Sequence, residues 1–113
     1  MKQIQARQDE TLKLIKEIIL NTAKKYNIEI DKIILFGSRA RGDYREDSDW
    51  DILVIIKKFN KRNINKFILE VTRYLAKKGI DVHIIAVERN YYEKYKEVYG
   101  DISGITKIEG RVI

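Results

Sequence analysis

Apolar residues along this chain repeat at two different spacings, and the change of spacing divides the chain into predicted helices and strands. Between residues 9 and 26 they recur every three or four positions, which predicts an amphipathic helix. A second helical pattern follows Asn60, a residue type that caps helices, and ends at Gly79. The apolar positions of the two predicted helices are Leu12, Ile15, Ile19, Ala23 and Tyr26, then Ile64, Phe67, Ile68, Val71 and Leu75.

Three continuous apolar runs predict short buried strands. The first, "KIILF" (32–36), is closed by Gly37; the others are "DILVII" (51–56) and "IDVHIIAV" (80–87). The connection of about a dozen residues between the first two strands permits an antiparallel pair, whereas the helix between the second and third suits a parallel crossover. We therefore expect an α+β fold with a small mixed β-sheet and helices packed on it, forming one domain over 1–113.

The pattern is weaker after the third strand. The segment "NYYEKYKEVY" (90–99) predicts a last short helix, and we expect 100–113 to be irregular, with at most a short edge strand, because glycines interrupt it. This tyrosine-rich and apolar region could be a docking surface for a partner or could pack on the domain's own core, and the pattern leaves both open. Its residues are Tyr91, Tyr92, Tyr95, Tyr99 and Ile102 to Ile113.

Composition narrows the classes of protein. The chain has no cysteine, which excludes disulfides and cysteine metal sites, and no apolar run approaches the roughly 20 residues that span a bilayer. Its N-terminus lacks the apolar core of a signal peptide, so we expect a cytoplasmic protein with no membrane partner. The net charge of +6 could indicate nucleic acid, nucleotides or an acidic protein as a partner, but the lysines are scattered and fit a solvated basic surface as well.

Two acidic residues, Asp49 and Asp51, stand at the beginning of the second predicted strand. On a strand they point to one face while Trp50 points to the other. Two carboxylates about 4 Å apart repel by about 4 kcal/mol at an effective dielectric of about 20, so they need an arginine, a proton or a divalent cation nearby. Oxygen ligands of this kind suit Mg²⁺. An acidic loop in which Asp49 caps a turn is the ordinary alternative.

The predicted topology brings further residues to these two acids. An antiparallel first pair places the end of the first strand, with Gly37 and Ser38, beside the start of the second. A parallel crossover places Asp81, at the start of the third strand, there as well. Three carboxylates and a Gly-Ser turn would then share one edge of the sheet. His83 shares the face of Asp81 and could be a supporting group or simply a half-buried histidine.

The Gly-Ser turn has chemistry of its own. Glycine allows a ligand to approach the backbone, and Ser38 could cap a short helix, "SRARGD", whose free N–H groups would face an anion. Arg39 and Arg41 add positive charge. An acid cluster beside an anion cradle describes a site for a nucleoside triphosphate and Mg²⁺, whereas a Gly-Ser pair on its own is more often an ordinary turn.

The stretch "GSRARGDYREDSDWD" resembles the signature of the DNA polymerase beta-like nucleotidyltransferase superfamily, a Gly-Ser followed after ten residues by Asp-x-Asp. The short length is similar to the minimal nucleotidyltransferases, the antitoxins of HEPN–MNT toxin–antitoxin pairs. The resemblance covers about residues 30–87 and implies the polymerase beta-like nucleotidyltransferase fold. Larger members carry an extra domain for base and acceptor, for which this chain has no room.

The resemblance also implies roles for individual residues. Asp49, Asp51 and Asp81 would be the catalytic carboxylates and the ligands of Mg²⁺, with two ions expected. Gly37 and Ser38 would hold the triphosphate of ATP, with Arg39 and Arg41 as further phosphate contacts. The reaction would transfer AMP to a tyrosine of a partner HEPN ribonuclease toxin, which implies a hetero-oligomer.

Two other functions compete with this one. The chain could neutralise a toxin by binding alone, or it could be a nucleotidyltransferase for RNA or a small molecule. The charge of +6 mildly supports RNA, but the lack of room for an acceptor domain makes it the less favoured acceptor.

Overall fold

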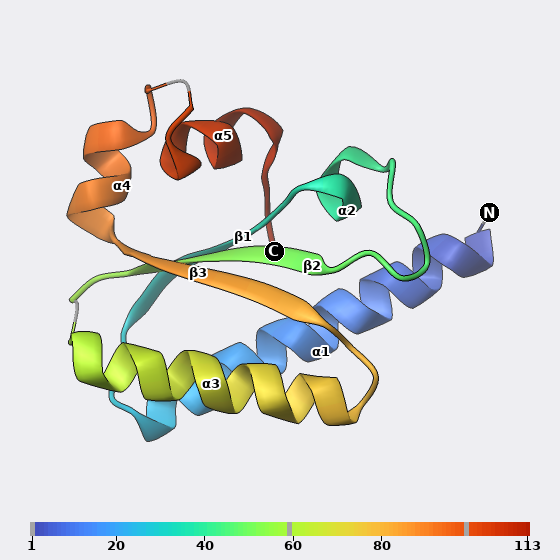
Figure 1. Ribbon diagram of the computed structural model, residues 1–113, viewed down its shortest axis with the longest axis horizontal. Coiled ribbons are helices and arrows are strands. Elements are labelled where there is room, and N and C mark those ends of the chain that lie inside the picture. Colours follow the sequence, from blue (N-terminus) through green and yellow to red (C-terminus); the bar gives the residue numbers. More distant parts are fainter. Residues whose placement is uncertain (1, 59, 99) are drawn as a thin grey trace.

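A computed structural model describes residues 2–58, 60–98 and 100–113, with side chains described from residue 7 onward. A four-stranded sheet in the order β3-β2-β1-β4 forms its centre. Figure 1 shows α1 and α3 on one face of this sheet and α4 and α5 on the other. In chain order the elements are α1 (Lys2–Lys25), β1 (Ile30–Phe36), α2 (Ser38–Arg41), β2 (Trp50–Ile56), α3 (Lys61–Lys77), β3 (Val82–Glu88), α4 (Arg89–Tyr95), α5 (Ile102–Glu109) and β4 (Arg111–Val112).

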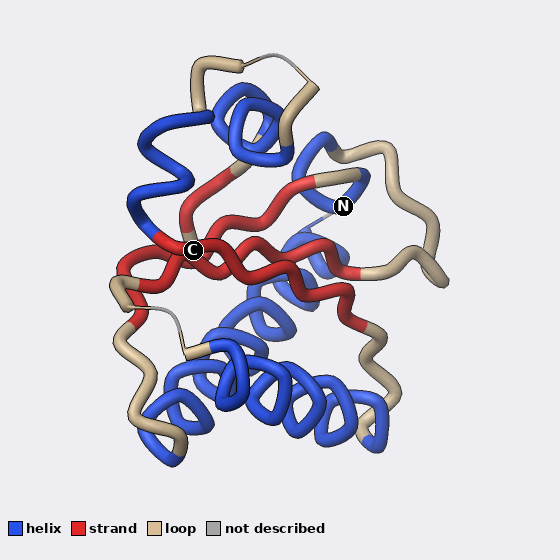
Figure 2. The backbone as a smooth tube through the Cα atoms, turned by 60° about the vertical axis from the view of Figure 1, so that its left-hand side comes forward, coloured by secondary structure: helices blue, strands red, loops and turns tan. Residues whose placement is uncertain are grey.

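The strand pairing confirms the predicted topology. β1 runs antiparallel to β2, with Phe36 opposite Asp51, and β2 runs parallel to β3, with Asp51 opposite His83. β4 pairs antiparallel with the other side of β1, so the predicted edge strand is present. The fold is therefore the expected mixed sheet with helices on both faces, and Figure 2 shows the strands as one layer between them.

The larger core lies between the sheet and the α1/α3 layer. The apolar residues of the two predicted helical patterns form one side of this core, and alternate strand residues such as Trp50, Ile52 and Val54 form the other. Asn60 caps α3 as predicted, because its side chain accepts from the N–H of Asn63. α1 begins at Lys2, earlier than the predicted residue 9, because the preceding residues are good helix formers and contain neither glycine nor proline.

A smaller core fills the opposite face of the sheet, under α4 and α5. It contains Leu53, Ile55 and the buried Tyr92. Because side chains alternate along a strand, Asp51 lies on this face as well. Within the described ranges, no helix is both long and apolar enough to cross a bilayer.

The expectation that 100–113 is irregular is wrong, since α5 occupies most of it. Asp101 caps this helix by accepting from the N–H of Ser103 at 2.9 Å. Gly104 lies within the helix and is buried, so packing on the sheet outweighs the low helix propensity of glycine. Gly110 follows, where a Cβ would overlap the carbonyl oxygen of Thr106. α5 and β4 thus cover β1 beside the Gly-Ser turn.

Candidate active site

The Gly-Ser turn and Asp51 touch each other at the end of β1. Gly37 has a φ of 72°, a left-handed conformation that favours glycine. A Cβ at Gly37 would overlap Oδ2 of Asp51 and lie 3.1 Å from its Cγ. Both the backbone conformation and the available space therefore require glycine at this position, which places a carboxylate directly against the turn.

The other oxygen of Asp51 faces His83. Oδ1 lies 3.3 Å from Nδ1 of His83, which is its register partner on β3. The Asp51 side chain is 27% exposed and the His83 side chain 62%, so the pair opens to solvent. His83 therefore supports the orientation of Asp51, one of the two roles that the sequence left open.

Asp49 and Asp81 lie at the same edge of the sheet. The backbone N–H of Trp50 donates to the carbonyl of Asp81 at 2.9 Å, which ties the entrance of β2 to that of β3. Both aspartates are exposed. The expected meeting of Gly37, Asp49, Asp51 and Asp81 at one sheet edge is thus present at the level of the backbone.

The acidic side chains do not form a ready-made metal cage. Across the part of the chain that the structure describes, no group of three His, Cys, Asp or Glu side chains is placed to hold a metal ion. Mg²⁺ at nucleotide sites keeps several waters and binds one or two carboxylates together with substrate phosphates, so it does not require such a cage. The exposed carboxylates of Asp49 and Asp81, beside the half-buried Asp51, fit this mode of Mg²⁺ binding. The assignment of all three as metal ligands stays a prediction.

Ser38 is the first residue of α2 and does not cap it. Gly37 is the residue at the cap position, and it has no side chain with which to bond the first turn. The expectation that Ser38 caps this short helix is therefore wrong, because the turn is made by backbone conformation. The role of Ser38 as a phosphate contact remains a prediction.

Arg39 is engaged by the protein itself. Its guanidinium donates to the carbonyl oxygens of Glu46 and Ser48 and to the side chain of Gln8 on α1, over distances of 2.9 to 3.2 Å. It also lies over the rings of Tyr44 and Trp50, 4.5 and 4.4 Å from their centroids. Arg39 thus holds the loop that leads into Asp49, and a role in phosphate binding would require it to leave these partners.

Arg41 is the more available of the two arginines. Its guanidinium is close to Asp43 at 3.4 Å and to Glu109 at 3.2 Å, and its side chain is 45% exposed. These contacts raise the pKa of Arg41, mainly through the hydrogen bond to Asp43. It therefore stays charged beside the turn.

Glu109, at the end of α5, is a site residue that the sequence did not reveal. Its carboxylate accepts from the backbone N–H of Gly37 at 3.3 Å and pairs with Arg41. These are two of the groups predicted to meet the triphosphate, and in the structure a carboxylate of the protein itself accepts from both. A single glutamate on a helix that the pattern did not predict offers no motif by which to find it.

The tyrosine-rich region packs largely on the chain itself. Tyr92 is buried in the smaller core, and the rings of Tyr91 and Tyr95 lie 4.6 Å apart. Tyr91 is 41% exposed and donates to Asp101, while Tyr99 lies outside the described residues. These contacts favour the second of the two interpretations, packing on the domain's own core.

Comparisons with known proteins show the family to which the chain belongs. The family model described as a nucleotidyltransferase domain matches residues 8–113. Two proteins of Methanocaldococcus jannaschii, both named for an inferred protein adenylyltransferase activity, are 39% identical over 82 residues and 38% identical over 72 residues. These alignments cover 73% of this chain and 78% of the first relative, and 63% of this chain and 73% of the second.

Solved structures share the fold. A crystal structure of an inferred nucleotidyltransferase from Sulfolobus solfataricus superposes with a TM-score of 0.61 at 26% identity, over 93% of this chain and 80% of that one. A chain of a toxin–antitoxin crystal structure with AMP-PNP superposes with a TM-score of 0.55 at 19% identity, over 85% of this chain and 69% of that one. At this identity the second likeness shows the fold alone.

Proposed function

This chain belongs to the nucleotidyltransferase domain family, and on that premise we propose that it transfers AMP from ATP, with Mg²⁺, to a tyrosine of a partner HEPN ribonuclease and so acts as an antitoxin. The names of the relatives support AMP as the transferred group. The resemblance of the Gly-Ser and Asp-x-Asp signature to minimal nucleotidyltransferases supports the toxin tyrosine as acceptor. The observation that carries the proposal is the contact of Asp51 with the Gly37 turn.

In this proposal the turn binds the triphosphate and the acids serve the reacting atoms. The backbone at Gly37 and Ser38 and the guanidinium of Arg41 bind phosphate oxygens. Asp49 and Asp51, with Asp81, hold Mg²⁺. The bound metal supplies Lewis-acid stabilisation of the charge that develops on the phosphates.

The bond changes follow from in-line substitution at phosphorus. The acceptor tyrosine oxygen forms a bond to the α-phosphorus of ATP, and the bond from that phosphorus to the bridging oxygen breaks, which releases pyrophosphate. The proton of the tyrosine hydroxyl passes to a carboxylate, which we assign to Asp81 because it is exposed at the edge of the site. The products are a tyrosine–AMP phosphodiester and pyrophosphate.

Labelled ATP tests the proposal. The chain is incubated with α-labelled ATP, Mg²⁺ and a HEPN ribonuclease, and the label on the toxin is measured. Asp49→Asn and Asp51→Asn should each reduce transfer at least about a hundredfold while the melting temperature stays close to that of the wild type. Asp47→Asn, an exposed acid of the same loop, is the matched control and should leave transfer unchanged.

Three other outcomes would reject it. Full transfer by both aspartate variants would show that Asp49 and Asp51 take no part in catalysis. Neutralisation of the toxin without ATP, unaffected by either change, would establish binding alone. Label that appears on RNA or on a small molecule in a cell extract, and not on protein, would identify a different acceptor.

A further inference from the structure

The net positive charge of the chain belongs to one layer of the fold. α1 and α3 together contain eleven Lys and Arg residues and four Asp and Glu residues, whereas the rest of the chain contains twelve and thirteen. The net charge of +6 is therefore carried by these two helices. Both helices lie on the face of the sheet away from α4 and α5 (Figure 1), so the excess of cations belongs to that layer.

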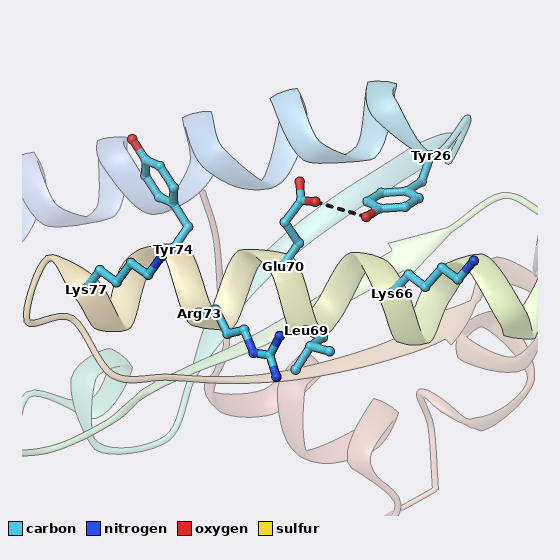
Figure 3. Close-up of a pocket in the computed structure, with 7 residues that line it drawn as sticks. All are labelled: Tyr26, Lys66, Leu69, Glu70, Arg73, Tyr74 and Lys77. Atoms are coloured by element: carbon cyan, nitrogen blue, oxygen red, sulfur yellow. Dashed lines mark hydrogen bonds between the residues drawn. The ribbon is translucent and has the colours of Figure 1, made fainter.

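Three cations of α3 have no acidic partner within the described ranges. Lys66, Arg73 and Lys77 are exposed, and Figure 3 shows them spread along one helix. Among the described residues, no carboxylate lies within 4.0 Å of any of their charged nitrogens. Their charges are therefore available to an external anion.

The one acid of α3 is already neutralised. Glu70 accepts from Nζ of Lys25 at 2.7 Å and from the hydroxyl of Tyr26 at 2.9 Å, the latter bond drawn in Figure 3. The hydrogen bond from Lys25, followed by that from Tyr26, lowers the pKa of Glu70. Glu70 thus ties α3 to α1 and does not balance Lys66, Arg73 and Lys77.

The surface around these cations is hollowed and carries an exposed aromatic ring. Two hollows of about 360 and 280 Å³ lie along α3 and between the helices, and both include Glu70 and Tyr74. Tyr74 is 45% exposed. The row of cations offers charge for phosphates. The exposed part of the Tyr74 ring, whose centroid lies 5.2 Å from Nζ of Lys78, offers a surface for a base.

We propose that the α1/α3 face binds the phosphodiester backbone of a nucleic acid. Eight of the eleven cations of the two helices are lysines, a residue type that is depleted in protein–protein interfaces and that neutralises phosphates in nucleic-acid complexes. The face lies across the sheet from Asp51, so the bound strand is a docking partner and not the acceptor of the transfer. This inference stands apart from the proposed transfer of AMP.

Fluorescence anisotropy on the full chain tests the inference. The probes are labelled strands of about 20 nucleotides, as single-stranded RNA, duplex RNA and duplex DNA, and the comparison ligand is poly-glutamate of similar charge. The variant combines Lys66→Gln, Arg73→Gln and Lys77→Gln. The matched control combines Lys94→Gln, Lys96→Gln and Lys107→Gln, which removes the same charge from α4 and α5.

The α3 variant should bind at least about tenfold more weakly. Its plot of log binding constant against log salt should be shallower by about 2 to 3, since each lost phosphate contact contributes about 0.7 to 0.9 to the slope. The control should retain the affinity and slope of the wild type, and thermal melting verifies that both variants fold. Whichever nucleic acid binds most tightly identifies the kind of strand.

The opposite results overturn the inference. About 50 mM is the low end of the salt range in which such contacts are measured. If the wild type binds no nucleic acid at this salt concentration, nucleic acid is not the partner. Equal weakening by both variants would mean that net charge and not this face matters. Binding of poly-glutamate as tightly as nucleic acid would assign the face to an acidic protein. Binding by the α3 variant that is as tight as that of the wild type would place the contact elsewhere.

Discussion

The carboxylate of Asp51 rests against the Cα of Gly37, so that the strand carrying a proposed metal ligand and the turn proposed to hold the triphosphate are in direct contact. No side chain fits between them. The position of the Gly37 turn therefore fixes that of the Asp51 carboxylate, and a substitution at residue 37 should displace the side chain of residue 51.

Gly37→Ala should abolish transfer and lower the stability of the fold. Gly42 provides the matched control, because it also has a positive φ, 91°, but has nothing within 4 Å of the place that an added Cβ would take. Gly42→Ala should lower stability by about 1 to 2 kcal/mol through backbone strain. Gly37→Ala should cost more, because its φ of 72° and ψ of −158° are nearly restricted to glycine and its Cβ overlaps Asp51. Only Gly37→Ala should reduce turnover, by about a hundredfold or more, because its methyl displaces Asp51. Equal activity of the two variants would contradict this geometry.

Glu109→Gln should tighten the binding of nucleotide. The carboxylate occupies the N–H of Gly37 and the guanidinium of Arg41 and would repel a triphosphate. Its neutral isostere should lower the Kd of a non-hydrolysable ATP analogue with Mg²⁺ about three- to tenfold, measured by titration calorimetry. Glu97→Gln, which removes an acid paired with Lys107, should leave the Kd unchanged. Weaker binding by Glu109→Gln would mean that this glutamate holds Arg41 in place for the nucleotide.

Arg39→Lys separates two roles for this arginine. If it positions the loop before Asp49, kcat should fall about ten- to a hundredfold and the Mg²⁺ needed for half-maximal rate should rise, with little change in the KM for ATP. If it contacts phosphate directly, the KM should rise with kcat largely kept. The hydrogen bonds to Glu46 and Ser48 favour the first result. Arg45→Lys, an exposed change in the same loop, serves as the control.

The cap of α5 should make stability depend on pH at the acid end. The backbone N–H of Ser103, followed by the hydroxyl of Tyr91, lowers the pKa of Asp101. A carboxylate with a lowered pKa in the folded state stabilises the protein above its unfolded pKa of about 3.9, and this contribution is lost as the pH falls through the folded value.

Asp101→Ala should therefore lower the melting temperature by a few degrees at about pH 5 to 7. The difference from the wild type should shrink below about pH 4, measured by thermal melting at each pH. Asp101→Asn keeps an oxygen acceptor for Ser103 and should lose less. A difference that stays constant down to about pH 2 would exclude the charge of Asp101 as its cause.

The sequence predicted the central part of the fold because local patterns dictate it. The runs at 32–36, 51–56 and 80–87 and the capped helix after Asn60 carry their own periodicity and boundaries, and the crossover rules then set strand directions. α5 could not be predicted in the same way. Its buried Gly104 contradicts helix propensity, and only contact with the sheet makes the helix favourable.

The candidate site could likewise be predicted from the sequence only in part. The meeting of Gly37, Asp49, Asp51 and Asp81 at one sheet edge could be predicted, because their spacing and the strand directions bring their backbones together. The partners of Arg39 and the contact of Glu109 with Gly37 join residues far apart in the chain. No spacing rule covers such pairs, since their geometry comes from the packing of α1 and α5.

The short pairing of β4 with β1 has a mechanical consequence. Among the described residues, two register pairs, the hydrogen bond from Ile113 to Ile33 and the packing of the Ile113 side chain on the larger core hold β4 to the sheet. Glu109 lies two residues before this strand. A force or a binding event that peels the strand away would pull the glutamate off the Gly37 amide. Displacement of β4 would therefore free the N–H of Gly37, one of the donors that we propose bind the triphosphate.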